Sequence, residues 1–429
     1  MANPNAGHFF QTSESLVSGQ RKAAKAQNKL GRPIKLSSKL LAIVPDPFDE
    51  RAVYVAEAAG EVRRIVLEVS FDVSWLFSLR VGWNILYLLG NSYTTAILPF
   101  RQYKVKSANR VTCQTGERIS VDRATAPLTS LAFSPNGQRL YSGCWDKNVY
   151  ATDFESGATT HLTAHTDFVK CLLTTTLAGK PILLSGSADA TIIVWDLSTN
   201  KPLHKLKGHV KAVQNLAIDP LSLPSGSSAP GESFVLFSSS SDREIRRWHI
   251  SLARAHELPE SLERPLRPHE TTIWALRFDS EGDLWTASAD KTAKHLVRSR
   301  GWEADTVLRH ADFVGDVLPC DDLGLVVTAC RDEEVRVWDV ASGECVCVYE
   351  GHFEEVTGLA RVGRGTVASV SIDGTVRRWG LERGEMKRFG EERAREAQGE
   401  SADVGVKKGG PQLTAEEEDE LAELMDDSD

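Results

Sequence analysis

The sequence lacks the short motifs that mark common enzyme and metal sites. It contains no HExxH, no GxSxG, no P-loop phosphate sequence and no Cys/His spacing typical of zinc. Its seven cysteines include no Cys-x-x-Cys pair, and the closest two are Cys345 and Cys347. Scattered thiols of this kind favour a reducing compartment. We therefore expect an intracellular protein of the cytoplasm or nucleus that is not an enzyme and needs no cofactor or metal.

Long apolar runs are also missing. The most apolar stretch, residues 73–100, is interrupted by Arg80, Asn84 and Asn91, whereas a membrane helix needs about 20 consecutive apolar residues. The first residues show no basic region followed by an apolar run, so they do not resemble a secretory signal. We expect neither membrane insertion nor secretion.

What the chain does contain is a repeat in which tryptophan follows aspartate by six positions. The pattern occurs at Asp189, Asp242, Asp332 and Asp373, and weaker copies at Asp146 and Asp290 lack the tryptophan. Successive aspartates are 41 to 53 residues apart. A four-stranded propeller blade takes roughly 40–45 residues. The spacing therefore predicts six blades of an all-β propeller.

A seventh copy lies upstream, and it is interrupted. Residues 59–68 parallel residues 373–382, but the turn that should follow arrives only at Thr115. Removing residues 69–114 restores the repeat spacing, so we interpret this segment as an insertion between the third and fourth strands of the first blade. Val69-Ser70 can be encoded by a consensus 5′ splice site, which leads to the hypothesis of a translated intron. A genuine blade insertion and a membrane segment are the alternatives.

The combination of Gly-His, Ser/Thr, Asp and Trp-Asp in order resembles the WD-repeat family of seven-bladed β-propellers, over residues 38–390. The resemblance implies a hydrogen-bonded network in each blade that is structural, with one copy per blade arguing against a single active site. In the first, second and fifth blades Ile65, Thr152 and Leu296 replace the tryptophan, so we expect these blades to be less rigid. The network residues are His165, Ser185, Asp189 and Trp195; His209, Asp242 and Trp248; His310, Thr328, Asp332 and Trp338; and His352, Ser369, Asp373 and Trp379.

The resemblance further implies that partners dock on one face of the propeller. On this face, the residue just before each repeat aspartate lies beside the residues two and three positions after each repeat histidine. Tryptophan and arginine are enriched in binding hot spots, which favours Trp145 and Arg331. The remaining candidates mix acids with phenylalanine, and this composition suits a basic peptide. They are Asp167, Phe168, Lys211, Asp312, Phe313 and Glu354.

The two ends of the chain carry opposite charge. Residues 1–37 form a basic arm, which we expect to be largely disordered and able to contact phosphate, and residues 391–429 form an acidic tail. Either residues 7–12 or residues 385–389 could supply the strand that closes the ring.

From these features we expect a monomeric propeller that acts as a protein-interaction scaffold within a complex. A regulatory or assembly subunit of a chromatin or ribosome-biogenesis complex, using the charged termini, is one alternative. A ubiquitin-ligase substrate receptor is the other, although the sequence shows no recognisable F-box and no Trp-Asp-x-Arg pattern.

Overall fold

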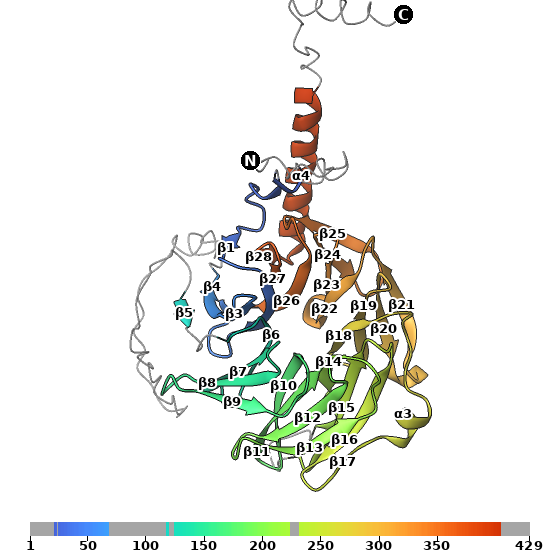
Figure 1. The fold of residues 1–429 in the computed structure, drawn as a ribbon. Helices are drawn as coiled ribbons and strands as arrows, with labels where there is room; N and C mark the ends of the chain where they lie inside the picture. The colour runs from blue at the N-terminus through green and yellow to red at the C-terminus, as the bar shows by residue number, and fades with distance from the viewer. Residues whose placement is uncertain (1–20, 24, 68–116, 120–123, 224–230, 405–429) are drawn as a thin grey trace, which may run out of the picture. The chain divides into compact units, whose positions relative to one another are not determined.

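The fold is a ring of seven antiparallel four-stranded sheets (Figure 1). It is seen in a computed structural model, which describes residues 21–23, 25–67, 117–119, 124–223 and 231–404. Neighbouring innermost strands contact each other around the whole ring, and contact between β2 and β26 brings the last sheet beside the first. The expected seven-bladed all-β propeller is therefore confirmed.

In six blades the four strands follow one another in sequence, from the centre of the ring to its rim. Blades 1 to 3 are β2–β5 (Leu40–Pro45, Ala52–Glu57, Val62–Val66, Glu117–Ile119), β6–β9 (Leu128–Phe133, Arg139–Cys144, Asn148–Asp153, Thr159–Thr163) and β10–β13 (Val169–Leu177, Lys180–Ser187, Thr191–Asp196, Lys201–Lys207). Blades 4 to 6 are β14–β17 (Val213–Ile218, Ser233–Ser240, Ile245–Ser251, Ala255–Glu257), β18–β21 (Ile273–Phe278, Leu284–Ser288, Thr292–Val297, Glu303–Arg309) and β22–β25 (Val314–Cys320, Leu325–Cys330, Glu334–Asp339, Cys345–Glu350). Short helical turns lie between strands at η1 (Pro220–Ser222), α3 (Pro259–Glu263), η2 (Arg298–Arg300) and η3 (Asp321–Leu323).

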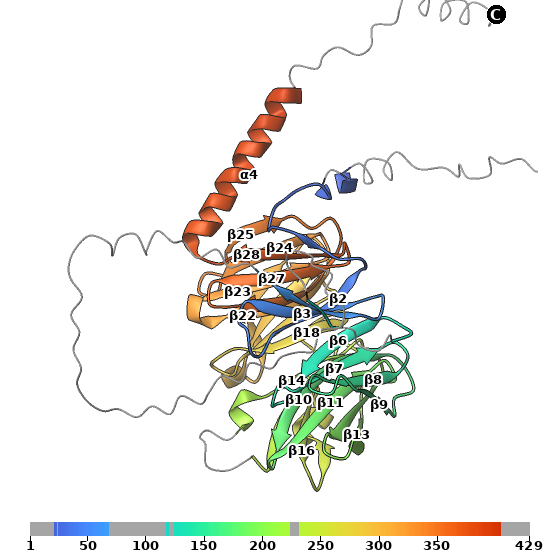
Figure 2. The ribbon, with the colours of Figure 1, turned by 90° about the vertical axis from the view of Figure 1, so that its left-hand side faces the viewer.

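The seventh blade is completed by the N-terminal part of the chain. Its strands β26–β28 (Val356–Val362, Thr366–Ser371, Thr375–Gly380) are joined at the rim by β1 (Ile34–Lys35). Ile34 pairs with Val376 and Lys35 with Thr375. The blue N-terminal segment accordingly lies beside the orange-red C-terminal strands in Figures 1 and 2.

The candidate closing strand at residues 385–389 was wrong, because these residues begin helix α4 (Arg383–Val404). Glutamate, arginine and alanine dominate this segment, and all three are good helix formers. The other candidate, residues 7–12, lies outside the described residues.

Apolar side chains fill the spaces between neighbouring sheets. Between blades 3 and 4, for example, Leu184, Val194, Leu236 and Trp248 pack together with almost no solvent exposure. Because every strand shows one side to each neighbouring blade, both faces of a sheet must be apolar, and this explains the fully buried pattern of β12 and β23. Burial on both faces holds each blade in the ring.

One turn is repeated in all seven blades between the second and third strands. Its residue after the aspartate position has a positive φ, between +63° and +79°, in every blade. Glycine adopts this conformation without steric cost, which explains Gly60 and Gly374. The other five positions are occupied by Lys147, Ala190, Arg243, Lys291 and Glu333.

The two strands that flank the interruption in the first blade are neighbours in the structure. Strand β4 pairs with β5 from Val62 opposite Ile119 to Arg64 opposite Glu117. The expected position of the interruption, between the third and fourth strands of this blade, is where the structure has it. Residues 69–114 themselves lie outside the described part of the chain, so their origin stays a hypothesis. Among the described helices, none has the length and apolar character needed to cross a membrane.

Candidate functional site

The histidines and aspartates of the repeat bond to one another within their blades. In blade 3, His165 Nδ1 lies 3.0 Å from Asp189 and its Nε2 lies 2.8 Å from the Ser185 hydroxyl, to which Trp195 Nε1 donates at 2.8 Å. Each polar atom in this buried chain therefore has a partner, which avoids a cost of about 1–3 kcal/mol per unpaired group. Blades 4 and 7 repeat the arrangement with His209, Ser238, Asp242 and Trp248, and with His352, Ser369, Asp373 and Trp379.

The carboxylates of these networks are held in their ionised form. Burial alone would raise the pKa of Asp189, but hydrogen bonds from Thr191, Thr166 and His165 lower it to about 2. Burial likewise lowers the pKa of His165, which favours the neutral imidazole. His165 and Ser185 are both buried, and the Ser185 hydroxyl also accepts from Trp195, so the arrangement favours a structural role over catalysis.

Blade 5 has a network that the sequence analysis missed. His269 Nδ1 lies 2.8 Å from Asp290 and its Nε2 lies 2.8 Å from Thr286, although the blade has Leu296 in place of the tryptophan. Pro268 stands where a glycine usually precedes the histidine, and this hid the motif. The Asp290-Lys-Thr292 turn, which matches Asp373-Gly-Thr375, was the available signal.

Blade 6 departs from the expected network in the opposite direction. His310 Nε2 lies 2.8 Å from Thr328, and Trp338 Nε1 donates to the same hydroxyl at 2.9 Å. Asp332, however, accepts from Arg336 Nη2 at 2.7 Å, and His310 Nδ1 is buried without a hydrogen-bond partner among the described residues. The expected bond between His310 and Asp332 was therefore wrong, because an arginine two residues before the tryptophan takes the carboxylate.

The two sets of candidate docking positions meet on one face of the ring. In each blade, the backbone N–H before the aspartate position donates to the carbonyl just before the innermost strand, at 2.8–3.2 Å. We call the surface made by these paired turns the turn face. The seven donor and acceptor pairs are Ala58 with Lys39, Trp145 with Pro127, Ala188 with Phe168, Ser241 with Ala212, Ala289 with Thr272, Arg331 with Phe313, and Ile372 with Glu355.

Two of the candidate residues form an aromatic stack between blades 2 and 3. The rings of Trp145 and Phe168 lie 5.1 Å apart at an interplanar angle of 14°, with Lys170 Nζ 5.7 Å from the tryptophan ring. Asp167 accepts a hydrogen bond from the backbone N–H of Phe168. Trp145 and Phe168 remain 38% and 37% exposed, so the stack is open to a partner. Trp274, at the start of β18, is also 38% exposed and was not predicted.

The other candidates on blades 6 and 7 form a charged cluster. The Arg331 guanidinium lies 5.2 Å from the Phe313 ring and 4.0 Å from Glu355. Asp312 accepts from the backbone N–H of Phe313. Glu354 is bound by Lys22 of the N-terminal arm at 2.7 Å. On blade 4, Lys211 is exposed, and its carbonyl accepts from Ser240.

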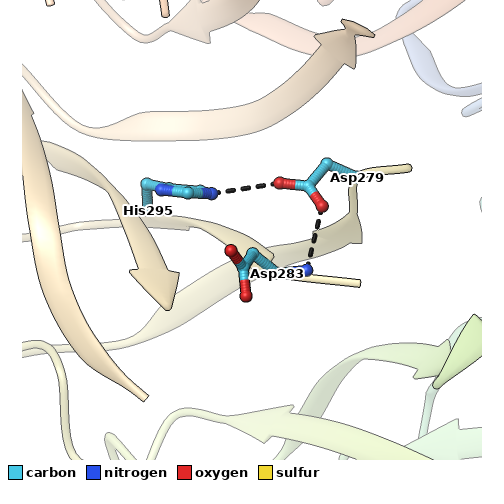
Figure 3. Close-up of side chains that lie close together, drawn as sticks. All are labelled: Asp279, Asp283 and His295. Carbon is cyan, nitrogen blue, oxygen red and sulfur yellow. Dashed lines mark hydrogen bonds and ion pairs between the residues drawn. The ribbon is translucent and has the colours of Figure 1, made fainter. Parts of the chain in front are cut away.

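Asp279, Asp283 and His295 converge in blade 5 in a way that superficially fits a metal (Figure 3). Both imidazole nitrogens are already used, because Nε2 lies 3.0 Å from Asp279 and Nδ1 lies 2.9 Å from Asp305. Burial works against protonation, but the two carboxylates raise the pKa of His295 above its ordinary value. Because both ring nitrogens already have carboxylate partners and these carboxylates favour the protonated ring, the cluster favours a structural role over a metal site.

Comparison with known proteins agrees with this geometry. The sequence model described as "WD domain, G-beta repeat" matches residues 117–153, 157–196, 260–295 and 343–380. A protein of Schizosaccharomyces pombe named "Uncharacterized WD repeat-containing protein C126.01c" is 31% identical over 100% of both chains. The chain belongs to the WD-repeat family. WD-repeat propellers are generally non-catalytic scaffolds that bind other proteins in complexes.

More distant WD-repeat relatives match shorter parts of this propeller. Nuclear distribution protein nudF of Aspergillus niger is 31% identical over 44% of this chain and 39% of its own. Pre-mRNA-processing factor 19 of Bos taurus is 26% identical over 42% of this chain and 32% of its own. The similarity to these two relatives therefore covers less than half of this chain.

Proposed function

We propose that this WD-repeat protein is a non-enzymatic intracellular scaffold that binds other proteins through its turn face. The observation that carries the proposal is the open stack of Trp145 and Phe168. Large apolar side chains exposed on a folded surface cost solvation, and their enrichment at interfaces reflects what they gain on burial. A partner that covers the two rings would recover that free energy.

The rigidity of the turn face supports this assignment. The seven backbone hydrogen bonds fix the turns. The side chains just before the aspartate positions therefore project from a backbone that is already ordered. A preordered surface loses little conformational entropy on binding. Within the described residues, the histidines and aspartates of blades 3, 4, 5 and 7 are engaged with each other, which supports binding in preference to catalysis.

The thiols support an intracellular location. Burial raises the pKa of Cys171 and of Cys330 to about 12, and that of Cys144 to about 11. Such thiols stay protonated and unreactive at neutral pH. None of the six described cysteines forms a disulfide. This is what we expect of a protein in a reducing compartment.

Affinity purification with mass spectrometry tests the proposal with the full chain. We expect W145A and R331E each to lose a defined set of proteins that the wild-type chain retains. V307A, which removes an exposed apolar side chain from the rim strand β21, is the matched control and should keep the set. Partners that survive both turn-face changes but disappear with V307A would place the interface on the rim instead.

A second candidate is an assembly subunit of a machine that contains nucleic acid. Lys29, Arg32, Lys35 and Lys39 are exposed along the N-terminal arm, and cations in such a row attract phosphate. The relative named Pre-mRNA-processing factor 19 gives this candidate further support. If it holds, the protein should sediment in particles that ribonuclease treatment disperses.

A further inference from the structure

The N-terminal arm is fixed to blade 7 from Asn28 onward. The Asn28 side-chain amide donates to the Gly351 carbonyl at 2.9 Å, while its Oδ1 accepts from Arg377 at 2.7 Å. Arg377 is itself buried and also donates to the Leu30 carbonyl. Gly31 lies directly against the Trp379 ring, where a Cβ would come within 2.6 Å of a ring carbon. This part of the arm belongs to the core of the propeller.

The turn that precedes Asn28 is attached in a different way. Lys25 Nζ lies 2.6 Å from Glu333, Lys22 Nζ lies 2.7 Å from Glu354, and Arg21 reaches Glu333 at 3.4 Å. Arg21 and Lys22 keep much of their side chains in solvent. The ion pairs of Arg21 and Lys22 are therefore weak and screened by salt, whereas the Lys25–Glu333 pair, with 20% and 16% of its side chains exposed, is screened less. The contact of residues 21–25 with the propeller can therefore open while the rest of the arm stays in place.

The surface beneath this turn has an excess of negative charge. Asp312, Glu333, Glu354 and Glu355, which we call the acidic sector, face one nearby guanidinium, that of Arg331. Burial and the like charges of Asp312 and Glu354 raise the pKa of Glu355 despite Arg331. The three cations of residues 21–25 equal the three carboxylates that Arg331 leaves unbalanced. The arm thus complements the acidic sector in charge.

We propose that the acidic sector is the binding site for a lysine- or arginine-rich segment of a partner protein, and that residues 21–25 occupy it until that segment displaces them. The inference rests on the proposed function, since Glu355 of the acidic sector belongs to a paired turn of the turn face and Asp312 precedes Phe313 of another. It adds the chemistry of the partner and a competing occupant within the chain.

Competition by a tethered segment has a measurable consequence. Because Asn28 and β1 hold the arm beside the acidic sector, residues 21–25 act at an effective concentration on the order of millimolar. A partner segment binds only the fraction of molecules in which the sector is open, so its apparent affinity is reduced by that fraction. Release of residues 21–25 from the acidic sector does not disturb the ring, because β1, which pairs with β28, follows the anchored residue Asn28 in the sequence.

A fluorescent peptide with the sequence of residues 19–29 tests the proposal by anisotropy on full-length protein. We expect R21A/K22A/K25A to bind this peptide about tenfold more tightly than the wild-type chain, because the sector is then open. K29A/K35A/K39A removes the same charge from another part of the arm and should bind like the wild type. Adding E333Q/E354Q to R21A/K22A/K25A should abolish binding.

Two results would overturn the proposal. Equal affinity of the wild type and R21A/K22A/K25A would mean that residues 21–25 do not occupy the sector. Binding that persists after E333Q/E354Q would place the peptide elsewhere. The peptide assay needs no cellular partner, so it is independent of the W145A purification. If the peptide competes with residues 21–25 but W145A loses no partner, only the proposed function is contradicted.

Discussion

Blades 6 and 7 carry equivalent network residues, with Thr328 in the place of Ser369, yet only blade 7 completes the network. His352 is bonded through both ring nitrogens, to Ser369 at 2.7 Å and to Asp373 at 2.9 Å. In blade 6 the equivalent histidine reaches only its hydroxyl partner, and Arg336 holds the aspartate. Identity at the motif positions is therefore not sufficient, because a neighbouring side chain decides which partner the aspartate takes.

The arginine at this position occurs in both blades but has different neighbours. Arg377 of blade 7 is drawn to Asn28 and Leu30 of the arm, which leaves Asp373 to its histidine and to Thr375. In blade 4, Arg246 is held by Glu244 and Glu257, and the histidine–aspartate bond survives. Arg336 pairs with Glu334 in the same way, but Val348 lies opposite it on the neighbouring strand. Arg336 turns to the aspartate of its own blade.

Replacing the network histidine should give the largest difference in stability loss between blades 6 and 7. H352A removes the buried hydrogen-bond partner that Ser369 and Asp373 share and opens a cavity, so we expect a loss of about 3–5 kcal/mol in unfolding free energy. H310A removes one hydrogen bond and should cost about 1–2 kcal/mol. Thermal denaturation followed by circular dichroism measures both. Equal losses would show that the missing bond of blade 6 has no energetic meaning.

Acid should weaken blade 6 through His310. Burial, aided by the charge of Arg336, lowers the pKa of His310 to about 4 from its ordinary 6.5. The unfolded chain therefore binds a proton that the folded chain does not as pH falls from 6.5 to 4, and stability is lost across that window. Between pH 7.5 and 5 the loss is about 2 kcal/mol. H310Q should show a correspondingly flatter dependence of melting temperature on pH, and an unchanged slope would contradict this.

The residue before the histidine should also distinguish the blades. A Cβ at Gly351 would come within 2.8 Å of the Trp379 ring and 3.1 Å of Arg377, both of which are buried. G351A should therefore cost about 1–2 kcal/mol through overpacking. Blade 6 has Arg309 at this position, and R309A should stay within about 0.5 kcal/mol of the wild type. Urea unfolding midpoints give the comparison, which fails if the two substitutions have the same effect.

A double substitution should restore the missing histidine–aspartate hydrogen bond of blade 6. E334T/R336V copies the threonine that bonds the aspartate in blade 7 and removes the competing arginine, so His310 Nδ1 can reach Asp332. We expect a gain of about 1 kcal/mol in stability. The matched change in blade 4, E244T/R246V, removes the guanidinium that pairs with Glu257 and the carboxylate that pairs with Arg267, and should destabilise. The repair also predicts a shifted His310 ring resonance in NMR spectra, and no shift would show that the aspartate has not turned.

The repeat spacing in the sequence was sufficient to predict seven blades and the place of the interruption. These features depend on local chemistry and recur in register. Ser238 could have been found too, since it precedes Trp248 by the ten residues that separate Ser369 from Trp379. Its neighbours Ser239 and Ser240 made the choice ambiguous.

The features that could not be predicted depend on contacts between distant parts of the chain. Nothing near Arg336 in the sequence indicates that it takes Asp332, because the partners within its reach depend on the neighbouring strand, where Val348 lies opposite it. Docking of Lys22 and Lys25 on residues more than 300 positions away likewise has no local signal. In the described part of the arm, which we expected to be largely disordered, Lys22 and Lys25 pair with Glu354 and Glu333 and β1 joins blade 7.

The pairing of Ile34 with Val376 sets an order of events during synthesis of the protein. The ribosome adds Ile34 to the chain about 340 residues before Val376. At roughly 5–20 residues per second, the first strand waits about 20 to 70 seconds for its partner. Throughout that time blade 1 has an uncovered flank where blade 7 will pack. Nascent chains should thus depend on chaperones until the final blade has emerged.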